Sequence, residues 1–283
     1  MPEGDSVFRF AARVGEALTG KAITAARAHG PGPVPQVHRI VGATCTGTRA
    51  QGKNLFISFD NGLALRGHLR MYGTWHIYAP GERWQKPERE ARLVLETIDA
   101  VVVNFSAPVI ELLEERAIAF HAPIASLGPN LLDAEFDSDE VLRRFRDPDR
   151  AFTTIGDAIM DQQAMAGVGN IWKHETLFRE GLNPWRRVGE LGDETLLAMI
   201  ARSRDLLMAS IGKLERNGRT VMRPTMFVYG RAGNPCRRCS TRILSAPQGR
   251  DIRSTAWCPK CQPVSEGQAV QPPPPRGARQ AAR

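Results

Sequence analysis

The 283-residue sequence predicts an α+β protein of two domains. The period of its apolar residues is helical near the amino terminus, alternates over the next stretch as in β-strands, and becomes helical again in the second half. Four of the five cysteines then lie near the carboxyl end as two Cys-x2-Cys pairs. A chain of this length that is 42% hydrophobic can bury two modest cores, which favours two domains over one.

Residues 5–18 predict the first helix. Asp5 and Ser6 suit its amino-terminal cap, and Gly20 can end it. Its apolar residues recur at helical spacing. They are Val7, Phe10, Ala11, Val14, Ala17 and Leu18.

A β-hairpin is predicted next. Leu55, Ile57 and Phe59 alternate, and Leu63 and Leu65 resume the alternation after the turn sequence Asp-Asn-Gly. Further strand candidates are residues 74–78, 92–98 and 101–105. We therefore expect the first domain, residues 1–130, to be an antiparallel β-sandwich capped by one helix.

The second half has helical patterns over residues 152–165, 171–181 and 193–212. The charged stretch 131–150 contains an Asp-Pro-Asp sequence and is expected to link the two domains. Residues 263–283 hold four consecutive prolines and three arginines but little to bury, so we expect a disordered tail.

The two cysteine pairs predict a metal site. Cys236, Cys239, Cys258 and Cys261 can place four thiolates tetrahedrally around one Zn²⁺, with the 18 residues between the pairs forming a hairpin. The alternatives are two disulfides or chance. The sequence shows no secretory or membrane-spanning segment, so we expect a cytoplasmic location and reduced thiols.

The net charge of +8 is unevenly distributed. Residues 151–262 carry 17 Lys and Arg against 10 Asp and Glu, whereas residues 1–130 carry 14 against 12. A basic half that also holds the cysteines is typical of a domain that binds a polyanion, although a well-solvated surface is the alternative.

The chain begins Met1-Pro2-Glu3-Gly4. Removal of the methionine leaves Pro2 with a secondary α-amine, whose pKa near about 8 makes it more nucleophilic at neutral pH than lysine. Such an amine can attack a sugar C1′ and form a Schiff base, with Glu3 moving the protons. The alternative is that Pro2 is simply a second residue.

Asn170 follows the sequence Gly167-Val168-Gly169 between two helical patterns. Backbone N–H groups and an asparagine amide at a helix amino terminus form a site suited to a DNA phosphate. The alternative is an ordinary turn between two helices with Asn170 as a structural cap.

Two segments flank the predicted hairpin. Lys53 precedes its first strand and is expected to meet a phosphate or a leaving oxygen. After its second strand, His68 leads into Arg70, Met71 and Tyr72, which could wedge into a duplex and fill the gap left by an extruded base. The alternatives are a solvated lysine and a core methionine.

Seven motifs then carry a resemblance that runs from residue 2 to about residue 262. They are Pro2-Glu3-Gly4, Gln51 to Leu55, His68 to Gly73, Leu127-Gly128-Pro129, Gly167 to Asn170, Val228 to Arg231, and Arg253 to Gln262. In this order they resemble the formamidopyrimidine-DNA glycosylase and endonuclease VIII family of base-excision repair enzymes.

The resemblance implies a bifunctional DNA glycosylase and apurinic/apyrimidinic lyase. It implies that Pro2 is the Schiff-base nucleophile, Glu3 the general acid/base and Lys53 the residue of β-elimination. It assigns Arg253 to δ-elimination and phosphate binding, and assigns DNA contacts to Asn170, His68, Arg70, Met71 and Tyr72.

The same resemblance implies the architecture. Residues 151–228 should form a helix-two-turn-helix DNA-binding domain, and residues 229–262 a β-hairpin zinc finger whose single Zn²⁺ is structural. Four protein ligands leave that ion no open position for catalysis. We expect several arginines around the hairpin to face phosphates, so that binding falls steeply with salt. They are Arg237, Arg238, Arg242, Arg250 and Arg253.

The sequence departs from the family pattern at three places, and the first of them bears on the substrate. The formamidopyrimidine branch has an arginine-containing loop where this sequence reads Asn104 to Val109 without arginine. Together with Arg70-Met71-Tyr72, this favours the endonuclease VIII branch and oxidised pyrimidines. Ser126 stands where some members have a basic residue, and the 18-residue spacing within the finger is longer than usual.

The expected partner is damaged double-stranded DNA, with single-stranded or bubble DNA also open, and the expected state is a monomer without membrane contact. The alternatives are a catalytically silent damaged-DNA-binding protein on the same scaffold, an enzyme specific for 8-oxoguanine and formamidopyrimidines, or a zinc-ribbon transcription factor. Cys45, the fifth cysteine, is expected to be a buried structural thiol.

Overall fold

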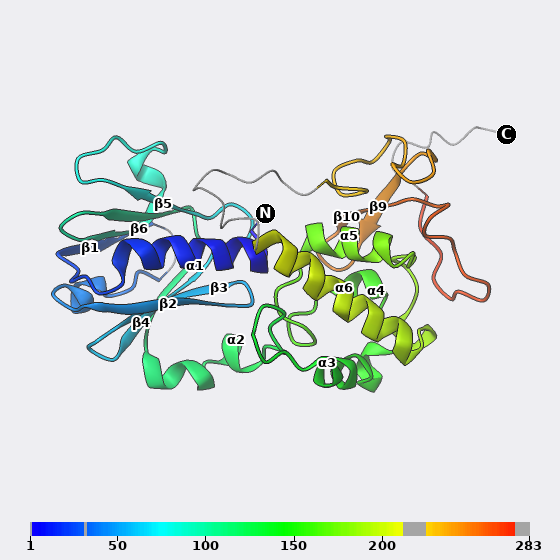
Figure 1. The fold of residues 1–283 in the computed structure, drawn as a ribbon, viewed down its shortest axis with the longest axis horizontal. Coiled ribbons are helices and arrows are strands. Elements are labelled where there is room, and N and C mark those ends of the chain that lie inside the picture. Colours follow the sequence, from blue (N-terminus) through cyan, green and yellow to red (C-terminus); the bar gives the residue numbers. More distant parts are fainter. Residues whose placement is uncertain (1, 31–32, 212–224, 275–283) are drawn as a thin grey trace. The chain divides into compact units, whose positions relative to one another are not determined.

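The computed structural model describes residues 2–30, 33–211 and 225–274. The chain forms two compact units, Met1–Ser126 and Leu127–Arg283, drawn in Figure 1 from blue to green and from green to red. The first unit contains one long helix and two antiparallel sheets, and the second is mainly helical with a β-hairpin. The predicted α+β class is confirmed.

Helix α1 spans Gly4–Leu18, close to the predicted range. Its N-cap is Glu3, so the helix begins before Asp5 and the predicted cap was wrong by two residues. Asp5 instead pairs with Arg9 one turn later, at 2.9 Å. Gly20 adopts φ +78° just beyond the helix, a conformation that glycine takes readily.

Two four-stranded antiparallel sheets complete the first unit. One has the order β1-β6-β7-β5, and the other has the order β2-β3-β4-β8. Their strands are β1 (Ala25–Ala28), β2 (Cys45–Gln51), β3 (Asn54–Phe59), β4 (Leu63–His68), β5 (Thr74–Tyr78), β6 (Ala91–Glu96), β7 (Val101–Phe105) and β8 (Val109–Glu114). The predicted hairpin is β3–β4, and β5, β6 and β7 lie where strands were expected.

Strands β1, β2 and β8 had no counterpart in the prediction. Each lies at the edge of its sheet, where one side of the strand is unpaired. Edge strands bury less and need less regular apolar alternation, so their sequences carry a weaker signal. The core between the sheets and under α1 includes Val14, Ile57, Leu65, Leu95 and Val102.

Short helices join these elements. They are η1 (Val37–Ile40), η2 (Glu88–Glu90), η3 (Glu115–Phe120) and α2 (Ala122–Ala125) in the first unit, and η4 (Pro148–Arg150) and η5 (Val188–Glu190) in the second.

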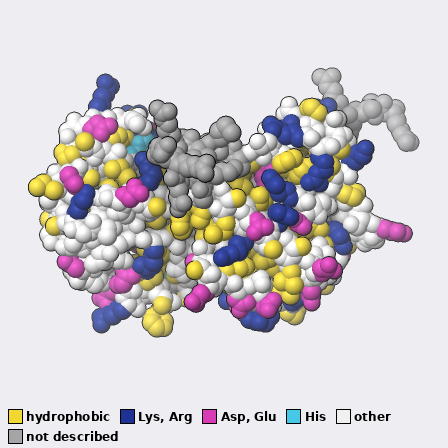
Figure 2. All heavy atoms as spheres, viewed as in Figure 1, with side chains coloured by type: hydrophobic (Ala, Val, Ile, Leu, Met, Phe, Trp, Pro, Cys, Tyr) yellow, Lys and Arg dark blue, Asp and Glu magenta, His cyan; other side chains and the backbone are white. Residues whose placement is uncertain are grey.

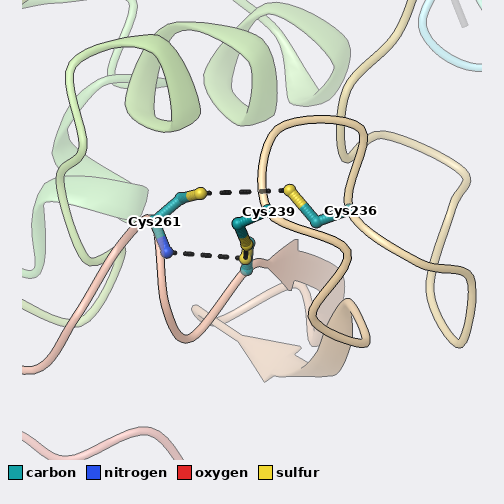
Figure 3. Close-up of side chains that lie close together, drawn as sticks. Cys236, Cys239 and Cys261 are labelled. Carbon is teal, nitrogen blue, oxygen red and sulfur yellow. Dashed lines mark hydrogen bonds between the residues drawn. The ribbon is translucent and has the colours of Figure 1, made fainter.

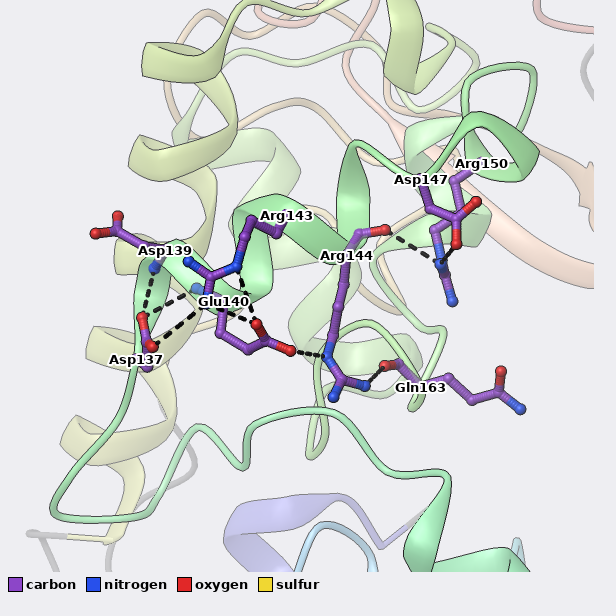
Figure 4. A network of polar contacts seen from close by, with 8 residues as sticks. All are labelled: Asp137, Asp139, Glu140, Arg143, Arg144, Asp147, Arg150 and Gln163. Atoms are coloured by element: carbon purple, nitrogen blue, oxygen red, sulfur yellow. Dashed lines mark hydrogen bonds and ion pairs between the residues drawn. The ribbon is translucent and has the colours of Figure 1, made fainter.

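The stretch 131–150 is folded rather than a free linker, which corrects the prediction. It contains helix α3 (Ser138–Phe145). The Asp137 carboxylate caps this helix by accepting hydrogen bonds from the backbone N–H groups of Asp139 and Glu140. Val141 and Phe145 are buried in the core of the second unit. Its charged residues pair with one another at the surface, as Figure 4 shows: Arg143 and Arg144 pair with Glu140 on the helix, and Arg150 pairs with Asp147 beyond it. The charge therefore marks the exposed face of a folded segment.

The second unit contains three further helices among its described residues: α4 (Ile155–Ala158), α5 (Asn170–Arg179) and α6 (Asp193–Ile211). The patterns over 171–181 and 193–212 predicted α5 and α6 well, with residue 212 outside the described range. The pattern over 152–165 was wrong in extent, because α4 has four residues and a turn-rich segment follows it.

Strands β9 (Leu244–Gln248) and β10 (Arg253–Trp257) form the predicted hairpin between the cysteine pairs. The described part of the expected disordered tail packs on this unit: Gln268 is buried and its amide donates to Asn183, and Val270 contacts Trp185 and Trp257. Residues 275–283 lie outside the described residues. None of the described helices combines the length and apolar character needed to cross a membrane.

Candidate functional site

The amino-terminal end of α1 carries the predicted nucleophile and its acid/base. Glu3 caps the helix through its backbone, where its carbonyl accepts from the N–H of Val7 at 3.0 Å. The Glu3 residue is only 1% exposed, whereas Pro2 before it is half-buried. A buried acidic residue thus adjoins the half-buried residue whose nitrogen becomes a secondary amine when Met1 is removed.

Helix α1 runs antiparallel to strand β2. Beyond the carboxyl end of the helix, the N–H of Gly20 donates to the carbonyl of Cys45 at 2.8 Å. At mid-helix, the Thr48 hydroxyl donates to the carbonyl of Ala11 at 2.7 Å.

This pairing brings Lys53 to the level of Glu3. From Ala11 back to Glu3 the helix covers about 12 Å. From Thr48 forward to Gln51, where β2 ends, the strand covers about 10 Å. Gly52 takes φ +57° in the turn between β2 and β3, and Lys53 is the next residue. The fold therefore gathers Pro2, Glu3 and Lys53 at one end of the first unit.

The side chain of Asn54 stabilises that turn. Its amide donates to the carbonyl of Gln51 at 3.2 Å and accepts from Arg66 Nε at 2.9 Å. Arg66, on β4, in turn donates to the Glu111 carboxylate at 2.5 Å. Asn54 and Arg66 are both buried. This network was not predicted, although an arginine within an apolar strand is a signal of a buried partner.

His68 pairs with Asn54 across β3 and β4, so the end of β4 also lies beside Lys53. Burial lowers the pKa of His68 to about 4, with the charges of Arg66, Lys53 and Arg70 adding to the effect. The imidazole is therefore neutral at physiological pH, and its Nδ1 accepts from the N–H of Arg70 at 3.3 Å.

The turn after β4 presents two large side chains to solvent. Leu69 is buried, whereas Met71 is 54% exposed and Tyr72 is 76% exposed. Gly73 closes the turn by donating to the Leu69 carbonyl at 3.0 Å, where a Cβ would meet Leu69 backbone atoms at 2.9 Å. Met71 is not a core residue, so the alternative interpretation of it was wrong.

The second unit forms its own cluster around α5. Gly169 is the N-cap and Asn170 the first helical residue, as predicted. The loop before them is held by Gln162, whose side chain donates to the carbonyl of Val168 at 2.9 Å and accepts from the N–H of Gly167 at 3.0 Å. Gly167 adopts φ +116° in this loop.

Three consecutive contacts tie α5 to β10. The Asn170 amide donates to the Ser254 carbonyl at 3.4 Å, and Lys173 Nζ donates to the Thr255 hydroxyl at 2.7 Å. His174 Nε2 accepts from the N–H of Ala256 at 2.8 Å. Because an asparagine amide has two hydrogens, Asn170 keeps one for a further acceptor. None of these tying roles was predicted for Lys173 or His174.

Arg253 opens β10, one residue before the strand contact with Asn170. Its Nε and Nη2 both donate to one carboxylate oxygen of Asp251, at 3.1 and 2.8 Å. The structure thus brings Asn170 and Arg253 together within the second unit, as their predicted roles require.

The four cysteines of the two pairs converge, as Figure 3 shows for three of them. Their sulfur atoms all lie within 4.8 Å of one another, with 3.4 Å between Cys239 and Cys258 and 3.9 Å between Cys236 and Cys261. A tetrahedral Zn²⁺ with Zn–S bonds of about 2.3 Å separates its sulfurs by roughly 3.8 Å. Disulfide S–S bonds are far shorter, about 2.05 Å.

The local chemistry also suits a cation. Backbone N–H groups of Arg238 and Cys261 donate to the sulfurs of Cys236 and Cys258. Hydrogen bonds from Thr241 lower the pKa of Cys239 to about 6, whereas burial and the neighbouring sulfurs raise that of Cys261 to about 12. Four thiols this close lose all their protons only when a cation compensates the charge.

Basic side chains surround this cluster and the hairpin. Figure 2 shows Lys and Arg side chains across the second unit, in the part where Figure 1 places β9, β10 and α5. The arginines at 237, 238, 242 and 250 are exposed. Such a surface attracts a polyanion.

Comparison with known sequence families gives two matches. Residues 1–108 match the formamidopyrimidine-DNA glycosylase N-terminal domain, and residues 127–221 match the formamidopyrimidine-DNA glycosylase H2TH domain. The two ranges fall in the two structural units.

Individual proteins similar to this chain point to the same family as the two domain matches. The chain is 36% identical over 266 residues to the probable endonuclease 8 2 of Streptomyces coelicolor, covering 93% of this chain and 94% of that protein. It is 37% identical over 270 residues to the DNA-(apurinic or apyrimidinic site) lyase Nei2 of Mycolicibacterium smegmatis, covering 94% and 100%. A solved complex between Lactococcus lactis Fpg and an abasic site containing DNA shares the fold, with a TM-score of 0.80, 21% identity, and 93% and 100% covered.

Proposed function

Because the chain belongs to the formamidopyrimidine-DNA glycosylase and endonuclease VIII family, we propose that it removes oxidised pyrimidines from DNA and nicks the strand through a Schiff base on Pro2. Family membership makes the protein a DNA glycosylase and apurinic/apyrimidinic lyase. The observation that supports the mechanism is the gathering of Pro2, Glu3 and Lys53 at one end of the first unit.

The first step replaces one bond by another at C1′. After removal of Met1, the Pro2 nitrogen attacks C1′ of the damaged nucleotide, and the N-glycosidic bond breaks as the base leaves with a proton. The buried Glu3 carboxyl is placed to take the proton from the amine and give a proton to O4′ as the C1′–O4′ bond breaks, so that the opened sugar carries an iminium at C1′.

The iminium then draws electrons from the sugar. Loss of a proton from C2′ expels the 3′ phosphate, which is the β-elimination assigned to Lys53. A second elimination expels the 5′ phosphate, with Arg253 stabilising the leaving phosphate. Asn170, at the start of α5, holds a DNA phosphate through its remaining amide hydrogen and the helix amino terminus.

The cysteine cluster holds one structural Zn²⁺ in this proposal. Cys236, Cys239, Cys258 and Cys261 supply all four ligands, so the ion organises the hairpin and takes no part in the reaction. Arg253 is carried by the strand that ends next to Cys258.

The preference for pyrimidines has two supports. Residues 104–109 form the end of β7, a short turn and the start of β8, and they contain no arginine. Met71 and Tyr72 are exposed in the turn after β4, where they are available to enter the gap left by an extruded base. The name endonuclease 8, carried by relatives, supports the endonuclease VIII branch, and the step from that branch to pyrimidine lesions is part of the proposal.

Excision rates test the substrate class. Single-turnover rates are measured on duplexes of the same length and flanking sequence. Each duplex contains dihydrouracil, thymine glycol, or an 8-oxoguanine that is paired with cytosine. We expect the two pyrimidine lesions to be released faster, and Glu3→Gln to abolish base release on all three. Faster release of 8-oxoguanine would favour the other substrate branch, and binding without any release would favour a silent damage-binding protein.

A further inference from the structure

The guanidinium of Arg253 is engaged by an acidic neighbour. Asp251 accepts from both Nε and Nη2, at 3.1 and 2.8 Å, through a single carboxylate oxygen. This edge of a guanidinium is one of those that bind a phosphate with two parallel hydrogen bonds. The carboxylate therefore lies where a phosphate oxygen would bind.

The two partners differ in how firmly they are held. Arg253 is 34% exposed at its side chain and begins a strand that is tied to α5 through the next three residues. Asp251 is 69% exposed at its side chain and lies in the four-residue turn between β9 and β10. Asp251 is therefore the partner that is free to move.

The turn holds one residue in a strained backbone conformation. Ile252, between the two partners, is exposed and adopts φ +51°. A β-branched residue rarely takes this left-handed conformation. A rearrangement of the turn that turns Asp251 away from Arg253 can relieve this strain.

Asp251 is also the one acidic residue of a basic hairpin tip. Arg250 and Arg253 lie on either side of it in the sequence. A carboxylate at a surface that meets phosphates repels them, in addition to occupying the arginine.

We propose that Asp251 sets the DNA affinity of the hairpin: its carboxylate holds Arg253 in the free protein and competes with the DNA phosphate for it. The inference rests on the proposed function, in which Arg253 binds a phosphate. Binding exchanges one ionic partner of Arg253 for another, and release reverses the exchange. Asp251 thereby weakens the grip on the nicked product and speeds its departure.

Asp251→Asn tests the competition, because asparagine keeps the shape and removes the charge. Affinity is measured on a duplex with a tetrahydrofuran abasic analogue, which cannot form the Schiff base. An exposed ion pair typically changes an equilibrium by up to about 5-fold, so we expect binding about 2- to 5-fold tighter at low salt. The gain should shrink as salt screens the charges.

Two comparisons isolate the effect. Asp193→Asn removes the same charge from a matched pair, because Asp193 is 65% exposed and its partner Arg146 34% exposed. It controls for the change in net charge. In an Arg253→Ala background, the gain of Asp251→Asn over Asp193→Asn should be smaller than in the wild-type background, because only the direct repulsion of phosphates remains to be relieved.

The outcomes separate this inference from the proposed function. If Asp251→Asn tightens binding no more than Asp193→Asn, or if its gain is undiminished without Arg253, the competition is refuted. If the wild-type protein does not prefer the abasic duplex to an undamaged one, the proposed function itself fails. Multiple-turnover rates should fall in Asp251→Asn while single-turnover rates stay unchanged, and equal effects on both would also contradict the inference.

Discussion

At the scale of single residues, the buried His174 ties the first residue of α5 to strand β10. Its Nε2 accepts from the N–H of Ala256, and its Nδ1 contacts the carbonyl of Asn170. Because Nε2 is an acceptor, the ring is neutral with its hydrogen on Nδ1. Burial lowers the pKa of His174 to about 3, and the charge of Lys173 adds to the effect.

This neutral histidine predicts a pH dependence of stability. Between its unfolded pKa of 6.5 and its folded pKa of about 3, the unfolded chain binds a proton that the folded chain does not. Stability is therefore present above pH 6.5 and is lost as pH falls, by about 1.4 kcal/mol per pH unit from this residue. Urea unfolding from pH 7.5 to 4.5 measures it.

His174→Gln cannot titrate, so it should lower stability at pH 7.5 but flatten the fall below pH 6.5 relative to wild type. Parallel curves for the two proteins would show that His174 is not buried in its neutral form.

At the scale of elements, the β3–β4 hairpin aligns the end of the first unit that carries Lys53. Asn54 and His68 are paired residues, so the turn before β3 and the turn after β4 lie at the same end of the sheet. The side-chain hydrogen bonds that Arg66 donates to Asn54 and to Glu111 fix this end of the sheet. The role of Asn54 is to position Lys53, since Asn54 contacts the turn before β3 rather than a substrate.

Asn54→Ala should therefore slow strand cleavage more than DNA binding. The substitution removes the hydrogen-bond donor to the Gln51 carbonyl and leaves Arg66 Nε without its acceptor. The loss should lower the free energy of unfolding by about 1–3 kcal/mol. A displaced Lys53 should slow β-elimination on the order of 10-fold. The measurements are cleavage of a preformed abasic site and binding of its tetrahydrofuran analogue.

Asn61→Ala is the matched control, because Asn61 fixes the turn at the opposite end of the same hairpin through its own side-chain hydrogen bonds. It should leave cleavage unchanged. Equal losses of cleavage in both variants would mean that hairpin stability, and not the position of Lys53, limits the step.

Elements with a strong apolar periodicity could be predicted. Elements and side chains that are held by contacts with residues distant in the sequence could not. Helix α1 and the β3–β4 hairpin have clear apolar patterns, and the cysteine spacing indicated the metal cluster. Helix α3 was not predicted, because dense charge is as typical of a linker as of the exposed face of a helix. The partners of Arg66 and His174 lie 45 and 82 residues away in the sequence, and a single sequence does not reveal such contacts.

At the scale of the whole molecule, the second unit combines the basic surface with the cysteine cluster. The hairpin between the cysteine pairs packs by Trp257 against Trp185, with ring centroids 4.5 Å apart. Trp257 directly precedes Cys258, so its fluorescence should report on the metal site. Metal binding and folding of this region are one equilibrium.

Metal removal should therefore disorder the hairpin and weaken binding to all DNA. We expect one Zn²⁺ per chain, and expect chelation or Cys258→Ser to shift tryptophan emission to the red and lower DNA affinity at least 10-fold, on the order expected when a structural metal is lost. Cys45→Ala, which removes the buried cysteine of the first unit, should keep the metal. A metal-free protein with full binding would contradict a structural role.

The most direct test of the proposed chemistry is covalent trapping at the amino terminus. Protein with a verified Pro2 terminus is incubated with abasic-site DNA and borohydride, and the adduct is mapped by mass spectrometry. We predict a reduced C1′–nitrogen bond at Pro2, and a strong loss of adduct in Pro2→Gly. An adduct at a lysine with Pro2 unmodified, or no adduct at all, would contradict the Schiff-base mechanism.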